Sequence, residues 1–448
     1  MHGQADVLHP VLFGLNPLWL STILFVLTYV VVMTERVNRA IVALLAAGLM
    51  IISGVLSQEE ALHGVDFNTL GLLIGMMVIV AITRQSGVFQ YLAIWSAKRV
   101  NAHPWGILVM LCLVTATTSA LLDNVTTVLL IVPVALLITE QLKVSPYPYL
   151  FSIIFSSNIG GTATLIGDPP NIMIGSAVGL SFNDFVFNLT PVIVVILAIT
   201  LLLIYFIWGR SLYSAPEDRQ RVMAFNEREA ITDSRLLKQC LIVIGLVVTS
   251  FALARQLGLE AATIAMFGAA ILLLLQNLPQ KPDDQSKNVH HAFSEVEWVT
   301  IYFFIGLFIV VHGVDVSGLL KLLGKYLVEA TGGNLHTTAF AILWASALLS
   351  AMIDNIPFVA TMIPLIKSMA PTFGGPEGLM PLWWALALGA CLGGNGTLVG
   401  ASANLVVAGF AERAGQPIRF VRYTLVAFPL MLISIAICTI YLYWRFLK

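Results

Sequence analysis

The chain alternates between long apolar runs and short polar segments. A helix needs about 20 apolar residues to cross the hydrocarbon core of a bilayer. Ten runs approach or exceed that length, and we expect each of them to cross the membrane. They are 17–33, 39–56, 67–83, 148–180, 189–209, 237–254, 259–276, 298–314, 381–412 and 420–443. The pattern therefore predicts an all-α polytopic membrane protein with about ten transmembrane helices.

Two of these runs, 148–180 and 381–412, are too long for one regular span. They contain "SNIGGTATLIGDPPN" (157–171) and "LGGNGTLVGASAN" (392–404). Glycine and proline interrupt a helix, and the freed backbone groups cannot face lipid. We therefore expect two broken helices whose breaks face protein or a wet cavity, where unwound carbonyls could coordinate a cation.

Two further apolar segments, 105–139 and 337–370, each carry an Asp–Asn pair near the middle, Asp123–Asn124 and Asp354–Asn355. A carboxylate at membrane depth costs several kcal/mol unless it is partnered or hydrated. We expect two re-entrant hairpins with these pairs at their tips, beside the broken helices. The alternative is that each aspartate caps the second arm of its hairpin, and both roles can hold together.

The second half of the chain repeats the first. Residues 65–87 align with 296–318 at an offset of 231, the hairpins align at the same offset, and 160–171 align with 393–404 at 233. Five crossings per half, an odd number, predict two inverted repeats, as in secondary transporters. The expected division is 1–209 for the first repeat, 210–238 for a polar cytoplasmic linker and 239–448 for the second repeat.

The positive charges predict the orientation. With both termini outside, 17 of the 23 Lys and Arg residues fall in inside loops and 6 fall outside. The linker supplies six of the seventeen, and the remaining 11 against 6 still agree with the positive-inside rule. The N-terminus lacks a basic stretch before the first apolar run, so we expect no cleaved signal peptide. The sequence thus predicts a multi-pass protein of the plasma (inner) membrane.

Composition agrees with a membrane protein and excludes other classes. Hydrophobic residues make up 58% and charged residues 10%, mean hydropathy is +0.90, and the net charge of −1 argues against a nucleic-acid partner. The four cysteines, which lack CxxC spacing, are interpreted as buried small apolar residues. With neither a Ser–His–Asp set nor a metal-ligand cluster recognisable, we expect no enzyme, no cofactor and no metal site.

Polar residues of the tips and breaks are the candidate ligands for a small solute or ion. They are Asp123, Asn124, Thr126, Asn158, Gly160, Gly161, Thr162, Thr164, Asn171, Asp354, Asn355, Gly393, Gly394, Asn395, Thr397 and Asn404. The structural alternative for the glycines is a kink or close helix packing. Asp168, which precedes Pro169 and has Ala401 at its repeat position, is expected to cap the following helix.

These tips and breaks resemble the ion transporter superfamily over nearly the whole chain. The most similar groups are ArsB-type arsenite/antimonite efflux permeases, NhaD-type sodium/proton antiporters and the P protein group. Sodium/dicarboxylate symporters are more distant, because their tips carry Ser-Asn-Thr where this chain has Asp-Asn. The resemblance implies a scaffold, an elevator-type transport domain formed by 105–180 and 337–412, and a homodimer in the lipid bilayer.

The expected function is therefore secondary active transport. No Arg or Lys lies within the four polar motifs, which favours a neutral or cationic solute. Proton-coupled efflux of arsenite or antimonite, the antiport of arsenical resistance, is the leading hypothesis, because As(OH)₃ is neutral at pH 7. A sodium/proton antiporter is the main alternative. An organic-anion carrier and a passive channel are less favoured.

Overall fold

The protein is described by a computed structural model that covers residue 11, residues 14–34 and residues 36–448. Within these residues every regular element is helical, which confirms the all-α prediction. The first half contains α1 (Pro17–Met33), α2 (Arg39–Ile52), α3 (Gln58–His63), α4 (Phe67–Gln85), α5 (Val88–Arg99), α6 (Pro104–Leu121), α7 (Asn124–Gln141), α8 (Tyr147–Thr162), α9 (Pro169–Val178), α10 (Phe182–Asn188) and α11 (Thr190–Ile204). The linker contains α12 (Pro216–Met223) and a 3₁₀ turn (Glu227–Ala230).

The second half follows the same order of elements. It contains α13 (Ser234–Ala252), α14 (Ala254–Leu257), α15 (Ala261–Asn277), α16 (Pro282–Ser294), α17 (Trp298–Val316), α18 (Leu319–Ala330), α19 (Leu335–Ser350), α20 (Asn355–Ser368), α21 (Met380–Gly393), the 3₁₀ turn Gly394–Gly396, α22 (Ser402–Arg413) and α23 (Phe420–Leu442). Each half therefore contains a helical hairpin followed by a helix that is interrupted in its middle.

Seven helices among the described residues are long and apolar enough to cross a bilayer, and four shorter apolar helices accompany them. The seven include α6 and α7, the two arms of the first hairpin, each 18 residues long. Length alone does not separate a re-entrant arm from a span. The end of each hairpin's first arm is instead bonded to the interrupted helix of its own half, as expected of a re-entrant hairpin.

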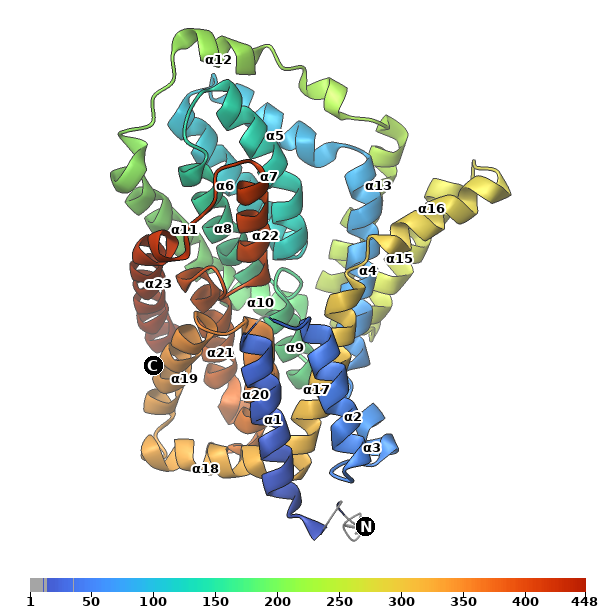
Figure 1. Ribbon diagram of the computed structural model, residues 1–448, viewed down its shortest axis with the longest axis vertical. Helices are drawn as coiled ribbons and strands as arrows, with labels where there is room; N and C mark the ends of the chain where they lie inside the picture. The colour runs from blue at the N-terminus through green and yellow to red at the C-terminus, as the bar shows by residue number, and fades with distance from the viewer. Residues whose placement is uncertain (1–10, 12–13, 35) are drawn as a thin grey trace.

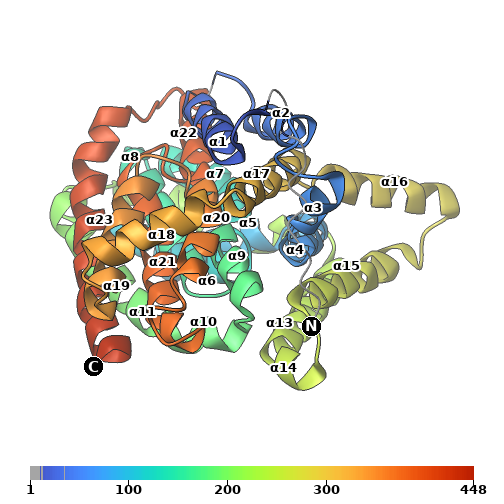
Figure 2. The same cartoon turned by 90° about the horizontal axis from the view of Figure 1, so that it is seen from below.

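The hairpins enter from opposite ends of the molecule. In Figure 1, α6 and α7 occupy the upper half, whereas α19 and α20 occupy the lower half. The broken helices lie beside them, since α8 packs against α6 and α21 packs against α19. Figure 2, seen from below, places α3, α4 and α13–α16 to one side of this group. The arrangement is that expected of two inverted repeats beside a separate set of helices.

Glycine contacts repeat between the two halves. A Cβ added at Gly160 would lie 2.2 Å from the Ala116 carbonyl oxygen, and one at Gly393 would lie 2.5 Å from the Ala347 carbonyl oxygen. These positions correspond at the repeat offsets of 233 and 231. In each half a glycine therefore lets the broken helix approach the backbone of the first hairpin arm. The same glycines were candidate ligands, and in the structure they are packing positions.

Hydrogen bonds from side chain to backbone also repeat. Ser119 donates to Ser157 O at 2.7 Å, and its counterpart Ser350 donates to Ala390 O at 2.6 Å. Thr164 donates to Ala120 O and Thr397 to Ala351 O, both at 2.5 Å. These bonds fasten each hairpin to the break of the interrupted helix in its own half.

The polar linker is more ordered than the sequence suggested. Helix α13 begins at Ser234, inside the predicted 210–238 linker, and α12 lies across the upper end of the molecule in Figure 1. Lys98 pairs with Glu227 at 2.5 Å, and Lys143 pairs with Asp218 at 3.1 Å. The hydrogen bond from the Lys98 ammonium lowers the pKa of Glu227. These ion pairs tie the linker to the end of α5 and to the turn after α7.

Candidate functional site

Four asparagines form one buried chain of hydrogen bonds between the two repeats. Asn124, at the first tip, donates to Asn158 Oδ1 at 3.2 Å. Asn158 Nδ2 lies 3.0 Å from Asn395 Oδ1 and 2.9 Å from Asn404 Oδ1. All four side chains are at most 4% exposed. The first tip, α8 and the second break thus meet through neutral amides, and these four predicted residues do come together.

Two asparagines close the breaks themselves. Asn171 donates to Thr162 O at 3.1 Å and to Thr164 O at 2.8 Å. Its counterpart Asn404 donates to Gly394 O at 2.8 Å and to Thr397 O at 2.9 Å. These carbonyls therefore each accept a hydrogen bond from an asparagine amide in this conformation, and coordination of a cation by the unwound carbonyls stays a prediction. Asn171 and Asn404 hold the shape of the two breaks.

The tightest turns of the breaks also depend on glycine. A Cβ at Gly161 would lie 2.6 Å from Gly167 O, and one at Gly394 would lie 2.9 Å from Gly400 O. In each break, the chain segments on either side of the turn therefore pack with their backbones in contact. Gly161 and Gly394 shape the site without offering it a side chain.

At the first tip, Asp123 caps its own hairpin arm. Its Oδ1 accepts from Thr126 N at 2.8 Å, and its Oδ2 accepts from the Thr126 hydroxyl at 2.5 Å. This is the capping role that the sequence offered as the alternative. Both carboxylate oxygens are bonded within the hairpin that contains them.

At the second tip, Asp354 pairs with Arg39, which belongs to α2 of the first repeat. Arg39 Nη1 lies 2.8 Å from Asp354 Oδ2, which also accepts from the Ser402 hydroxyl at 3.0 Å. Arg39 further donates to Thr300 at 3.2 Å, and its guanidinium lies 5.1 Å from the ring centroid of Phe303. Asp354 is therefore not a lone carboxylate. Arg39 is the first residue of α2, the second apolar helix, and it was not among the candidate site residues.

Asp168 differs from both tip aspartates. It holds the N-cap position of α9, yet its side chain makes no capping bond, which corrects the expected role. Oδ1 accepts from Asn355 Nδ2 at 3.5 Å, and Oδ2 is buried without a hydrogen-bond partner among the described residues. The residue is 1% exposed. The sequence showed an acidic residue within an apolar run. Because a proline follows it, the residue was interpreted as a helix cap.

Cys391 also belongs to this region. It occupies the repeat position of Asn158, and its thiol lies 3.5 Å from Asn171 Oδ1. The two repeats therefore contact each other through an amide at one place and a thiol at the matching place. Cys391 is buried, as the sequence predicted for all four cysteines.

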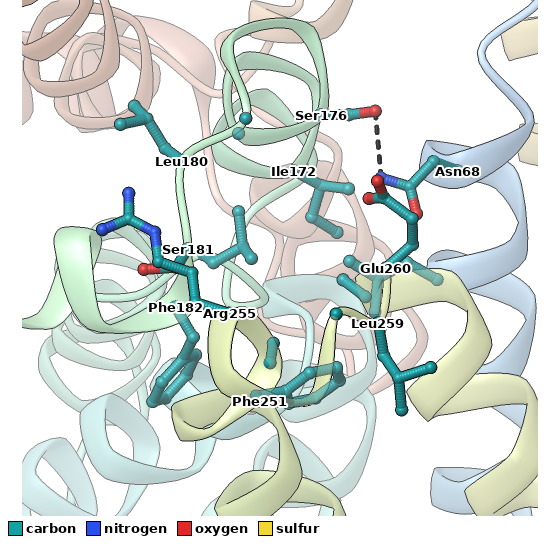
Figure 3. A pocket seen from close by; sticks show the side chains of 17 residues that line it. Asn68, Ile172, Ser176, Leu180, Ser181, Phe182, Phe251, Arg255, Leu259 and Glu260 are labelled. Atoms are coloured by element: carbon teal, nitrogen blue, oxygen red, sulfur yellow. Dashed lines mark hydrogen bonds between the residues drawn. The ribbon is translucent and has the colours of Figure 1, made fainter.

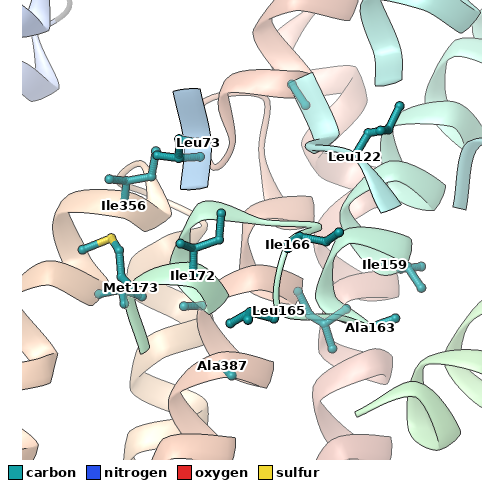
Figure 4. Close-up of a cluster of buried hydrophobic side chains, with 14 of the residues drawn as sticks. Leu73, Leu122, Ile159, Ala163, Leu165, Ile166, Ile172, Met173, Ile356 and Ala387 are labelled. Atoms are coloured by element: carbon teal, nitrogen blue, oxygen red, sulfur yellow. The ribbon is translucent and has the colours of Figure 1, made fainter. Parts of the chain in front are cut away.

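Apolar side chains enclose the polar centre. Figure 4 shows Leu122 of the first tip and Ile356 of the second on either side of Ile166 and Ile172 from the first break. All four are at most 4% exposed. Water is excluded by this packing, which strengthens the hydrogen bonds inside and penalises any polar atom left without a partner.

Two cavities border this centre at repeat-equivalent places. A cavity of about 320 Å³ is lined by Leu72 and Ile172, and one of about 280 Å³ is lined by their counterparts Phe303 and Leu405. The larger is shown in Figure 3, where Asn68 donates to Ser176 at 3.1 Å. The smaller is lined further by the Arg39–Asp354 pair. The larger is lined instead by 175–182, the C-terminal end of α9 and the turn that follows.

Comparison with known proteins adds the family. A family model described as "Citrate transporter" matches residues 29–389. An uncharacterized transporter of Mycobacterium tuberculosis is 42% identical over 427 residues, covering 94% of this chain and 97% of that protein. The human P protein is 32% identical over 506 residues, covering 94% of this chain and 59% of the P protein.

A solved structure shares the fold. The crystal structure of the Alcanivorax borkumensis YdaH transporter, described as having an unusual topology, aligns with a TM-score of 0.59 at 14% identity. The alignment covers 96% of this chain and 98% of that one. At this identity the likeness establishes the architecture, which is that of a polytopic membrane transporter.

Proposed function

The chain belongs to the citrate transporter family of membrane transporters, and for this member we propose proton-coupled efflux of a small neutral solute. Trivalent arsenic or antimony hydroxide is the solute class proposed first. The observation that carries the proposal is the buried chain of amides joining Asn124, Asn158, Asn395 and Asn404. Amides donate and accept hydrogen bonds without charge, as a neutral hydroxide requires.

The charge around the site supports a neutral solute. Arg39 is the cation that approaches the second tip, and Asp354 pairs with it at 2.8 Å. The pair leaves no net positive charge for an anion to bind. In this conformation the amides are bonded to one another, so a solute must replace those bonds when the site opens.

The unequal cavities support an elevator mechanism. The turn before α2 meets the tip of the second hairpin at Asp354, whereas the equivalent turn before α15 borders a cavity lined by the C-terminal end of α9. In a symmetric arrangement both turns would meet corresponding residues. This asymmetry supports a transport domain of hairpins and broken helices that moves along a scaffold between two positions.

A carboxylate carrier is the second candidate. It is favoured by the description of the family and by Arg39 beside the tip, because a guanidinium recognises carboxylates with paired hydrogen bonds. It requires Arg39 to exchange Asp354 for the substrate during transport. A sodium/proton antiporter remains the alternative in which the coupling ion is itself the solute.

Everted membrane vesicles with an imposed proton gradient and a pH-sensitive dye test these functions. We expect arsenite or antimonite to dissipate the gradient, and Asn158→Ala to abolish the response while the protein remains folded. A response to sodium alone would replace the proposal with sodium/proton antiport, and a response to citrate alone with the carboxylate carrier. Arsenite flux that is independent of the proton gradient would indicate a channel.

The proposed placement is the plasma membrane, with both termini outside and a homodimer formed through the scaffold. Ser145 and Thr372 follow the second arms of the two hairpins and are exposed. Single cysteines at these positions should be labelled from opposite faces of the membrane. Labelling of both from one face would contradict the inverted topology.

A further inference from the structure

Among the three aspartates of the site, Asp168 is the one whose side chain does not cap a helix. Asp123 and Asp354 each cap a hairpin arm through backbone N–H groups, at 2.8 Å and 3.1 Å. Asp168 stands at the equivalent position before α9 and makes no such bond. Its carboxylate is therefore not explained by helix capping.

The surroundings of Asp168 leave one oxygen unmatched. Oδ1 receives a long contact of 3.5 Å from Asn355, while Oδ2 is buried and has no hydrogen-bond partner within the described chain. The ion pairs found among the described residues do not include Asp168. The titratable groups that face it are the Cys391 thiol and the carboxyl groups of Asp354 and Asp123, none of which supplies a positive charge. A buried ionised carboxylate in this state is strongly unfavourable, so the negative charge needs a proton or a small cation.

The position is also unique within the duplication. Its repeat counterpart is Ala401, so the molecule has one such carboxylate rather than a symmetric pair. Asn355, its neighbour, lies at the tip of the second hairpin, whereas Asp168 lies in the break of the first repeat. The contact therefore crosses from one repeat to the other, where opening of the tip would expose the carboxylate.

We propose that Asp168 is the binding site of the coupling cation, a proton in the first place, and that the tip of the second hairpin covers it. This inference rests on the proposed function and names its coupling group. In the covered state a proton on Oδ2 neutralises the carboxyl group. When the tip moves away, water reaches Oδ2 and the proton leaves, so one proton is exchanged per opening of the tip. Asp123 and Asp354 then act as caps of the hairpin arms.

Infrared difference spectroscopy on the purified protein tests the site without knowledge of the solute. Between acid and alkaline pH, we expect a protonated-carboxyl C=O band that disappears in Asp168→Asn and persists in Asp123→Asn. Addition of sodium at constant pH that removes the band would support the same site with sodium as its ion. A full band in Asp168→Asn would overturn the proposal.

Two further variants keep the test decisive. Asp168→Glu retains a carboxyl group and should retain a band, even if Asp168→Asn proves unstable. Asn355→Ala should keep the band but shift the pH at which it titrates, because it removes the neighbouring amide. A titration unchanged in Asn355→Ala would contradict the covering role of the tip.

Transport measurements on Asp168→Asn test the cation site separately from the identity of the solute. Asp168→Asn should lose proton-driven accumulation and keep exchange of solute down its own gradient. Accumulation equal to that of the unmodified protein would overturn the role of Asp168. A chain that transports neither arsenite nor antimonite would refute the proposed solute, while the infrared result would still decide the cation site.

Discussion

The two hairpin tips start from the same Asp–Asn pair and end in different surroundings. Asp123 is bonded to Thr126 of its own hairpin through both oxygens. Asp354 is bonded to Arg39 of α2 and Ser402 of α22. A duplicated motif has thus kept its capping geometry in both halves, while one copy has acquired partners outside its hairpin.

Helix α1 also contacts the second hairpin next to its tip. Tyr29 of α1 donates to Pro357 O at 2.5 Å and lies 2.6 Å from the Thr361 hydroxyl. The residues that correspond to Pro357 and Thr361 in the first hairpin are Thr126 and Leu130. The elevator movement that we propose would therefore have to break contacts at the second tip, whereas the bonds of Asp123 would move with the first hairpin.

Removal of Arg39 should produce the largest structural effect. Arg39→Ala leaves Asp354, whose side chain is only 17% exposed, without its counter-ion. We expect a loss of at most about 3 kcal/mol, the lower end for breaking a buried ion pair, because the Arg39 side chain is itself 28% exposed. Thermal unfolding in detergent measures it, with the exposed Arg36→Ala in the same turn as control. An equal Tm for the two variants would show that the pair is not stabilising.

The amide chain should be the next most sensitive feature. Asn158→Ala removes three hydrogen bonds and leaves the polar groups of Asn124, Asn395 and Asn404 without that partner. The expected loss is about 2 kcal/mol, because each unsatisfied buried group is unfavourable. Cys391→Ala, at the equivalent position, should cost less than about 1 kcal/mol, since a thiol makes weak hydrogen bonds. Equal losses would contradict the difference between the repeats.

The contributions of the two tip aspartates to stability can be compared directly through their Asp→Asn variants. Asparagine still caps a helix, so Asp123→Asn should cost about 1 kcal/mol or less. Asp354→Asn should cost more, because Arg39 then lacks a negative partner. Chemical denaturation of both variants decides the order, and a larger loss at Asp123 would reverse our comparison.

The smallest effect is expected far from both tips, at the linker. The pKa of Glu227 is lowered by Lys98, so the pair stabilises the fold above the unfolded-state pKa of about 4.3. That stabilisation is lost as the pH falls through the folded-state pKa. Glu227→Gln should therefore lower Tm slightly at pH 7 and leave it unchanged well below pH 4. A Tm difference that persists in acid would contradict the electrostatic origin.

Much of the architecture could be predicted from the order of residues. Apolar run length, the glycine and proline breaks, and the duplicated polar motifs are local or periodic features. They predicted the all-helical fold of a polytopic membrane transporter, which the structure confirms. The linker was predicted less well, because α12 and its ion pairs depend on contacts with Lys98 and Lys143 far earlier in the chain.

The sequence by itself determined which residues are polar within apolar segments, because an isolated Asp or Asn in such a run is visible without any structure. Only the tertiary structure decided which of them meet. Arg39 and Asp354 lie 315 positions apart, and Asn158 and Asn404 lie 246 apart. In a dry interior each polar group must find a partner, and the packing of helices from both repeats selects it. That packing neutralises Asp354, engages Asp123 in its own hairpin, and leaves one oxygen of Asp168 unpaired.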